Sequence, residues 1–267
     1  MKRTLSLILA LCMVFAVMAL AACGESKPKI PETAHELFNS ATEKTQQLNC
    51  YEGVMDITMS LDMMGITLSM PMAINIKAQD LKTESPKIAM DMSMSMMGEN
   101  IDMEMYTDGQ WAYVVALGQS YKTPVAAAEN NYSDYVGDIL KELPEDLLEG
   151  VAVTVNEDGT RSFEAAITSD SFKTIYADFI MELAASAMGA ASGLESITIK
   201  DSKIAATVTE DLYFSAYSLS FGVELSVSGM TADMDIAVDL TYVEPGKDVV
   251  VTFPEGYEDF AVIDTGL

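Results

Sequence analysis

Apolar and polar residues alternate one by one along much of the chain, starting at Tyr51, and this period of two predicts β-strands with one buried face. Met64-Gly65, Gly98-Glu99-Asn100 and Asp108-Gly109 interrupt the alternation, and each has the composition of a tight turn. We therefore expect the segment from Tyr51 to Val114 to form an antiparallel meander.

A helical period of apolar residues replaces the alternation in three segments. Thr33 to Leu48 predicts a helix in which Thr33 is the N-cap and Glu36 follows three residues later, as in a capping box. Glu129 to Leu143 predicts a second helix. Ser171 to Met188 predicts a longer amphipathic helix, which is expected to cover another element.

Alternation returns after each of the two later helices. Between them, Val151–Val155 and Ser162–Ile167 flank Asn156-Glu157-Asp158-Gly159 and predict a hairpin. After the last helix the pattern predicts the strands Ser196–Ser202, Lys203–Thr209, Ala216–Ser228, Met230–Val243 and Val249–Phe253. Helix followed by strands thus occurs twice with no Pro, Gly or Ser-rich linker between, and we expect one continuous sheet with two related halves.

The N-terminal segment has the composition of an export signal. Lys2-Arg3 precedes an apolar run from Leu5 to Leu20, and this run is short for a membrane span. Leu20-Ala21-Ala22-Cys23 resembles the bacterial lipobox, which implies transfer of a diacylglyceryl group to the Cys23 sulfur. We expect residues 1–22 to be a lipoprotein signal peptide, 23–31 a lipidated tether and 32–267 the folded domain. An ordinary cleaved signal with an incidental cysteine is the alternative.

Composition narrows the range of partners. The chain has 41 acidic and 15 basic residues, for a formal net charge of −26. Nucleic acids and anionic lipid headgroups would be repelled, so we expect no nucleic-acid partner. Cys12 lies in the signal and Cys23 would carry the lipid, which leaves Cys50 alone in the domain. No disulfide is then expected within the domain, and Cys50 is interpreted as a buried structural thiol.

The sequence holds little material for catalysis. His35, in the first predicted helix, is the single histidine, and the chain has no nucleophile elbow, metalloprotease histidine pair, Cys-x-x-Cys or phosphate loop. A pair of carboxylates on the glycosidase plan is not excluded by composition, but most carboxylates fall on the polar side of the strands. Asn156-Glu157-Asp158-Gly159 is interpreted as a turn rather than a calcium loop. We expect no catalytic residue, no cofactor, no metal and no enzymatic activity.

The methionines are unusually concentrated. Of 20 in the chain, thirteen lie between Met55 and Met105, most of them on the apolar side of their strands. Methionine is flexible, so the same pattern fits a plain core or the wall of a cavity that adapts to apolar ligands. A third reading is a copper(I) site, because thioether sulfur is a soft ligand. The residues with the expected spacing are Met90, Met92, Met94 and Met96, about 6.6 Å apart along one strand face.

The order of these elements resembles the LolA/LppX-like half-barrel of exported bacterial lipoproteins, and especially an uncharacterised branch of them. The features that carry the resemblance are the helix opening at Thr33, the methionine-bearing hairpins, Asp108-Gly109-Gln110-Trp111-Ala112-Tyr113, the central helices and the closing Val249-Val250-Val251-Thr252-Phe253-Pro254. The resemblance implies an α+β, mostly β fold, in which a large curved antiparallel sheet forms a half-barrel with helices packed on its concave face. It also implies an apolar cavity, and some members of the family ferry lipids or lipoproteins.

We therefore expect a non-enzymatic extracytoplasmic protein, anchored to the cell membrane through lipid at Cys23, that binds a lipid or another apolar molecule. The Ser171–Met188 helix would be a lid. The expected ligand-binding residues are Met59, Met70, Met92, Met94 and Met103. The alternative is a structural or interaction module with a solid core that binds a protein of the cell envelope. Its expected anchors, if they are exposed, are Trp111, Tyr113, Tyr132 and Tyr135.

Overall fold

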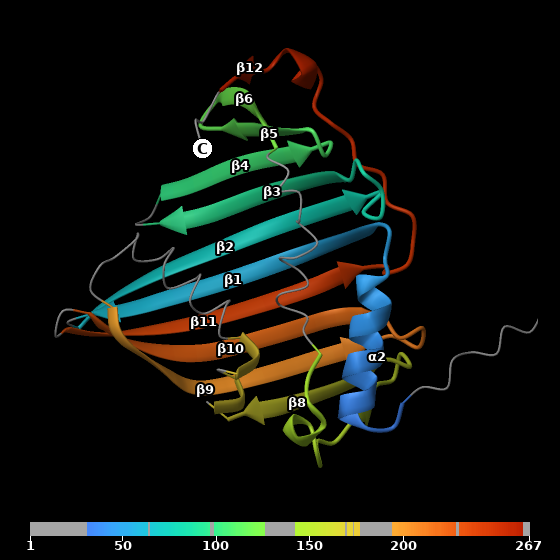
Figure 1. Cartoon of the computed structure of the whole chain (residues 1–267), viewed down its shortest axis with the longest axis vertical. Helices are drawn as coiled ribbons and strands as arrows, with labels where there is room; N and C mark the ends of the chain where they lie inside the picture. The colour runs from blue at the N-terminus through green and yellow to red at the C-terminus, as the bar shows by residue number, and fades with distance from the viewer. Residues whose placement is uncertain are drawn as a thin grey trace, which may run out of the picture. The chain divides into compact units, whose positions relative to one another are not determined.

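Twelve strands of the described part of the chain form a single sheet (Figure 1). The computed structural model describes residues 31–63, 65–96, 99–125, 142–168, 170–172, 174–176, 194–227 and 230–263. The strands are β1 (Tyr51–Met63), β2 (Ile66–Gln79), β3 (Lys87–Met96), β4 (Glu99–Thr107), β5 (Trp111–Ala116), β6 (Gln119–Pro124), β7 (Thr154–Val155), β8 (Arg161–Ile167), β9 (Leu194–Val208), β10 (Phe214–Val227), β11 (Met230–Val243) and β12 (Ala261–Val262). The expected mostly β fold with a large antiparallel sheet is confirmed.

Two meanders build this sheet. Its order is β12-β6-β5-β4-β3-β2-β1-β11-β10-β9-β8-β7, so β1 to β6 follow one another on one side and β11 back to β7 on the other. They join where β1 pairs with β11 from Glu52↔Val243 to Met63↔Ala232. Every neighbouring pair is antiparallel except β12 and β6, which run parallel. The sheet is therefore continuous across both halves of the chain.

One sequence-based strand assignment is wrong because of a β-bulge. Ser196–Ser202 and Lys203–Thr209 were predicted as two strands, but β9 runs unbroken through both. Phe221 lies opposite Ser202 and Val223 lies opposite Ile199, so two residues of β9 face one residue of β10. The bulge shifts the alternation by one position, which in the sequence has the pattern of a strand end.

The C-terminal segment also differs from the prediction. Val249–Phe253 is not a strand in the structure. The backbone N–H of Val251 donates instead to the side-chain oxygen of Gln79, at 3.0 Å. Residues 119–124 and 261–262, which were not predicted, form β6 and the edge strand β12. A further 3-10 turn, η2 (Tyr257–Asp259), precedes β12, and η1 (Glu145–Leu147) precedes β7.

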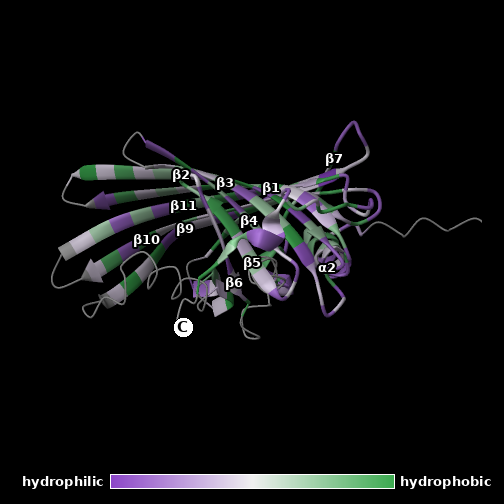
Figure 2. Cartoon of the chain, turned by 90° about the horizontal axis from the view of Figure 1, so that it is seen from above, coloured by the Kyte–Doolittle hydropathy of each residue, from purple (hydrophilic) through white to green (hydrophobic). Residues whose placement is uncertain are grey.

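The register places the apolar positions of all the long strands on one side of the sheet, here called the apolar face. Residues directly opposite each other in neighbouring strands point to the same side. One such row across seven strands consists of Met92, Ile74, Met55, Leu240, Tyr217, Ala206 and Phe163. The alternation is visible as green and purple bands along the strands in Figure 2. Aspartate, serine, threonine and lysine occupy most positions of the opposite side, the polar face.

Helix α2 (Ala34–Gln46) packs on the apolar face over β8 to β10. Its N-cap is Thr33, as predicted, and the Thr33 hydroxyl accepts the backbone N–H of Glu36 at 3.2 Å. Phe38 is fully buried, with its ring centroid 6.2 Å from that of Phe163 and 6.0 Å from that of Tyr217. The amphipathic pattern of this helix therefore serves to close the core on that half of the sheet.

The later predicted helices are described only in part. Of Ser171–Met188, residues 171–172 and 174–176 are helical, and the remainder lies outside the described residues. Phe172 and Tyr176 are fully buried, and the Phe172 ring lies 4.8 Å from that of Phe221 on the apolar face. Of Glu129–Leu143, residues 129–141 lie outside the described part, as do the signal and tether segments up to residue 30. Within the described residues, no helix is both long and apolar enough to cross a membrane.

Candidate functional site

Eight methionines form a half-exposed surface on the apolar face of β1 to β4. We call it the methionine surface, and its members are Met59, Met70, Met72, Met90, Met92, Met94, Met103 and Met105. Each comes from the apolar side of an alternating strand, so the sequence pattern alone puts them on one face. Aliphatic neighbours with the same half-exposed status fill the gaps between them: Ile57, Leu61, Leu68 and Ile101.

The five methionines predicted to bind a ligand lie together on this surface. Met59 is directly opposite Met70, and Met92 is directly opposite Met103. Met94 follows Met92 on the same side of β3 and lies one row from Met70, since its direct partner on β2 is Met72. Opposed side chains in an antiparallel pair have Cβ atoms about 5 Å apart, so Met59 is in reach of Met70 and Met92 is in reach of Met103, with Met94 in the row between these two pairs. Their role as ligand-binding residues stays a prediction.

Burial falls steadily along these strands from one end of the sheet to the other. On β2, Ala78 is completely buried, Ile74 is 9% exposed, Met72 and Met70 are half-exposed, and Ile66 is 74% exposed. The same trend runs from Thr107 to Ile101 along β4. The methionine surface is thus continuous at one end with the closed core and at the other with the open end of the sheet.

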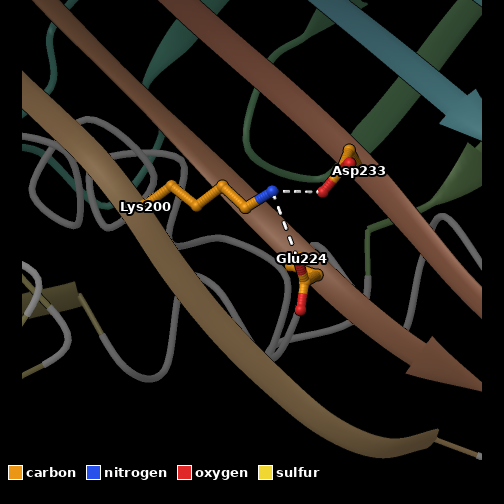
Figure 3. A network of polar contacts seen from close by, with 3 residues as sticks. All are labelled: Lys200, Glu224 and Asp233. Atoms are coloured by element: carbon orange, nitrogen blue, oxygen red, sulfur yellow. Dashed lines mark hydrogen bonds and ion pairs between the residues drawn. The ribbon is translucent and has the colours of Figure 1, made fainter.

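The polar face carries a network of charges that is separate from the methionine surface. Lys200, in the bulge of β9, reaches across β10 to Glu224, at 3.3 Å, and to Asp233 on β11 (Figure 3). The hydrogen bond to Asp233 is the main reason that the pKa of Lys200 is raised. Asp233 lies directly opposite Asp62, and the lysine offsets the repulsion between these carboxylates.

Buried tyrosines line the junction between the helices and the sheet. The hydroxyls of Tyr176 and Tyr217 are 3.3 Å apart and share a hydrogen bond. Burial raises the pKa of Tyr217 well above its ordinary value, and burial likewise raises the pKa of Tyr51 to about 12. Tyrosines in this state stay neutral at all physiological pH values, which is consistent with packing rather than proton transfer.

Two of the four aromatic residues of the interaction-module hypothesis lie in the described part of the chain. Tyr113 is only 3% exposed because residues of the C-terminal segment cover it, with the Tyr257 ring 5.0 Å away. Its role as an anchor was expected only if it proved exposed, and its burial excludes that role. Trp111 is half-buried beneath the ammonium of Lys122, at 5.3 Å from the ring centroid. Tyr132 and Tyr135 lie outside the described residues.

His35 and Cys50, the other residues considered for chemistry, each contact a neighbouring polar group of the fold. His35 is half-buried and its Nε2 lies 2.9 Å from the side-chain amide of Asn39. Cys50 was expected to be buried but is half-buried, and its thiol donates to the carbonyl of Lys247 at 3.4 Å. In the described part of the chain, no three His, Cys, Asp or Glu side chains are grouped so as to hold a metal ion. Cys23 lies outside the described residues.

Sequence reasoning found the methionine surface but missed its end. Ile66 begins the alternating strand β2, yet it is one of the most exposed large apolar residues, and Leu117, at 82% exposure, was not singled out. The signal was present in the sequence, because Met64-Gly65 and Leu117-Gly118 place a large apolar residue where turns usually have Asn or Asp.

Three comparisons relate the chain to other proteins. A family model described as a family of unknown function, DUF6612, matches residues 33–247. No curated protein matches the chain. Among solved structures it is similar to LprF from Mycobacterium bovis, with 11% identity, a TM-score of 0.45, and 84% of this chain and 97% of LprF covered.

Two further similar structures have lower TM-scores. The LolA superfamily protein NE2245 from Nitrosomonas europaea has 10% identity and a TM-score of 0.26, with 84% of this chain and 96% of that protein covered. A putative outer membrane lipoprotein-sorting protein domain from Vibrio parahaemolyticus has 8% identity and a TM-score of 0.22, with 79% and 92% covered.

Proposed function

The chain belongs to DUF6612, a family of unknown function, and we propose from its own residues that it is a membrane-anchored extracytoplasmic lipoprotein that holds a lipid or another apolar molecule on its methionine surface, without catalysing a reaction. The observation that carries the proposal is that eight methionines on four neighbouring strands are only half-buried. If these methionines served only a solid core, burying them further would stabilise the fold by about 25 cal/mol for each Å² of apolar area.

The composition of the surface suits a ligand of variable shape. Thioether side chains have three rotatable bonds and polarisable sulfur, so they adapt to acyl chains of different length. Most neighbouring positions on this face of β1 to β4 are apolar, from Ile57 to Ile101. Glu99, at the start of β4, is the exception, and the other charges of these strands lie on the polar face. Such a surface binds through burial of apolar area and not through ionic contacts.

The proposal includes the half-barrel of LolA/LppX-like lipoproteins, with the apolar face as its concave side and helices packed on it. The contacts of Phe38 with Phe163 and Tyr217 support this placement of α2. Anchoring rests on the lipobox residues Leu20 to Cys23, since two acyl chains on one cysteine hold a protein stably on a bilayer.

The test is to purify the protein, extract it with organic solvent and identify by mass spectrometry the apolar molecules that accompany it. We expect a stoichiometric lipid-like ligand, which the variant Met92→Asp/Met94→Asp loses while it remains folded by circular dichroism. Ser93→Asp/Ser95→Asp is the matched control, because both serines lie on the polar face of β3 and the pair adds the same two negative charges to the same strand. Retention of the ligand by the folded double variant would remove the methionine surface from the site.

The alternative, an envelope protein partner bound by an interaction module, has lost one expected anchor through the burial of Tyr113. If this protein carries no apolar ligand when it is isolated, that result would favour the alternative.

A further inference from the structure

Four hairpins turn at the same end of the sheet, and their loops share an unusual composition. The loops join Met63 to Ile66, Met96 to Glu99, Ala116 to Gln119 and Val227 to Met230. Each contains two residues with glycine second, and the first residue is Met64, Met97, Leu117 or Ser228. Of the sixteen residues from these four segments, Glu99 alone is charged. We call this end of the sheet the apolar rim.

The opposite end of the sheet has turns of ordinary composition. Its connections are Asp80–Pro86, Asp108–Gln110, Asn156–Thr160, Thr209–Tyr213 and Glu244–Asp248, and each contains at least one Asp or Glu. Asp108-Gly109 shows what a conventional turn does here, because the Asp108 carboxylate accepts the backbone N–H groups of Gln110 and Trp111, both at 2.9 Å. The two ends therefore differ in chemistry, and the difference is not required by the turns themselves.

Leu117 gives the clearest evidence that the rim is not shaped by packing within the chain. It has a φ of 52° and is followed by Gly118 at 74°, so the loop has positive φ at both central positions. Asparagine, aspartate or glycine adopts the first of these positions easily, whereas for leucine the left-handed conformation costs about 1 kcal/mol. Leu117 is nevertheless 82% exposed, so burial in its own fold does not offset that cost.

The described part of the rim is also continuous with the methionine surface. Ile66, 74% exposed, begins β2, and Leu68 and Met70 follow it on the same face. From the β5–β6 hairpin to the β10–β11 hairpin the rim extends across eight strands, about 34 Å at the usual spacing. Ile66 on β2 and Leu117 after β5, the exposed apolar side chains that the structure describes on the rim, lie three strands apart, or about 14 Å. Apolar side chains separated in this way match a flat apolar medium better than a compact pocket.

We propose that the apolar rim docks into the surface of a lipid bilayer, with Ile66 and Leu117 entering the boundary between headgroups and acyl chains. The rim has no Lys or Arg and the chain carries a net charge of −26, so the fitting surface is a neutral, zwitterionic one rather than an anionic one. Docking there presents the open end of the methionine surface to the membrane. The proposal does not depend on whether that surface holds a ligand, because the rim binds the bilayer through its own side chains.

The experiment uses the full chain with Trp111→Phe, which removes the single tryptophan. A tryptophan is then introduced at the rim by Ile66→Trp or, as a matched control, by Val250→Trp. Val250 is 72% exposed and adjoins Val251, whose N–H binds Gln79 at the far end of β2. With vesicles of phosphatidylcholine brominated on its acyl chains, we expect the Ile66→Trp emission to shift to the blue and to be quenched several-fold more than that of Val250→Trp.

A second comparison tests the rim as a unit. Adding Leu117→Asp to the Ile66→Trp protein is expected to reduce the quenching several-fold, whereas adding Val155→Asp, at a position 63% exposed beside the opposite end, leaves it unchanged. Equal quenching at positions 66 and 250 would overturn the proposal. So would a blue shift of the Ile66→Trp emission that grows with protein concentration in the absence of vesicles, since the rim would then be covered by a second copy of the chain.

Discussion

Met59 on β1 lies directly opposite Met70 on β2, and both side chains are half-exposed on the apolar face. On the other side of β1, the direct partner of Met59 is Ile236, which is 3% exposed. The boundary between closed core and open surface therefore passes close to β1, within a single continuous sheet.

Met59→Ala should lower the stability of the protein only slightly. The side chain is half-exposed, so its truncation is expected to lower the free energy of unfolding by about 1 kcal/mol, against about 3 kcal/mol for Leu219→Ala in the fully covered part of the same face. Urea denaturation of the two variants measures both values. Equal losses would show that the methionine surface is closed in solution.

Tyr242→Phe should leave the protein as stable or make it more stable. The hydroxyl of Tyr242 is buried without a hydrogen-bond partner in the described structure, so its removal relieves a desolvation penalty of about 1 kcal/mol. Tyr113→Phe is the matched control, because the Tyr113 hydroxyl donates to the Asp108 carboxylate at 2.9 Å and its loss should destabilise. Thermal melting of both variants gives the comparison, and a lower melting temperature for Tyr242→Phe would contradict it.

Asn39→Ala should destabilise the protein by about 2 kcal/mol. The Asn39 side chain accepts the N–H of Leu143 at 3.0 Å and donates to its carbonyl at 3.1 Å, and it so ties helix α2 to a buried residue far along the chain. Asn39→Asp keeps the acceptor and loses the donor, so denaturation should place it between wild type and Asn39→Ala. A wild-type value for Asn39→Ala would show that the tie contributes nothing.

Stability should fall in alkaline solution between about pH 10 and pH 12. Burial raises the pKa of Tyr51 to about 12, and burial together with the hydrogen bond to Glu104 raises the pKa of Tyr106 to about 12, from an ordinary value of 10.0. In this interval the folded chain holds protons that the unfolded chain releases. The stabilisation is therefore complete below pH 10 and is lost as the pH rises through 12. Denaturant midpoints across this range test it, and Tyr51→Phe should make the decline shallower.

Much of the sheet was predictable because alternation survives wherever one face is buried. Met230–Val243 was predicted with the same bounds as β11, and Thr33 was recognised as the N-cap of α2. The strand β9 was divided in error at Ser202 because a bulge inverts the alternation there. Val249–Phe253 has the composition of a strand, but its Val251 pairs with a side chain, and sequence does not disclose such tertiary partners.

The candidate site was predictable only in part, for a related reason. That Met92 and Met94 share a face follows from their spacing of two residues. That Met103 lies directly opposite Met92 depends on the register of the β3–β4 hairpin. The half-exposure of these side chains depends on which elements cover each part of the sheet, and residues on other strands and helices decide this.

The pairing of β1 with β11 has a consequence for how the chain is made. Glu52 is paired with Val243, and β6, the edge of the first meander, is completed by Ala261 and Val262 near the end of the chain. During synthesis, the first meander is thus without the partners of both its borders until β11 and β12 have emerged. Contacts so distant in sequence also form slowly. The sheet is consequently expected to close only after Val262 has been synthesised, so β1 and β6 wait for partners that lie more than 130 residues further along the chain.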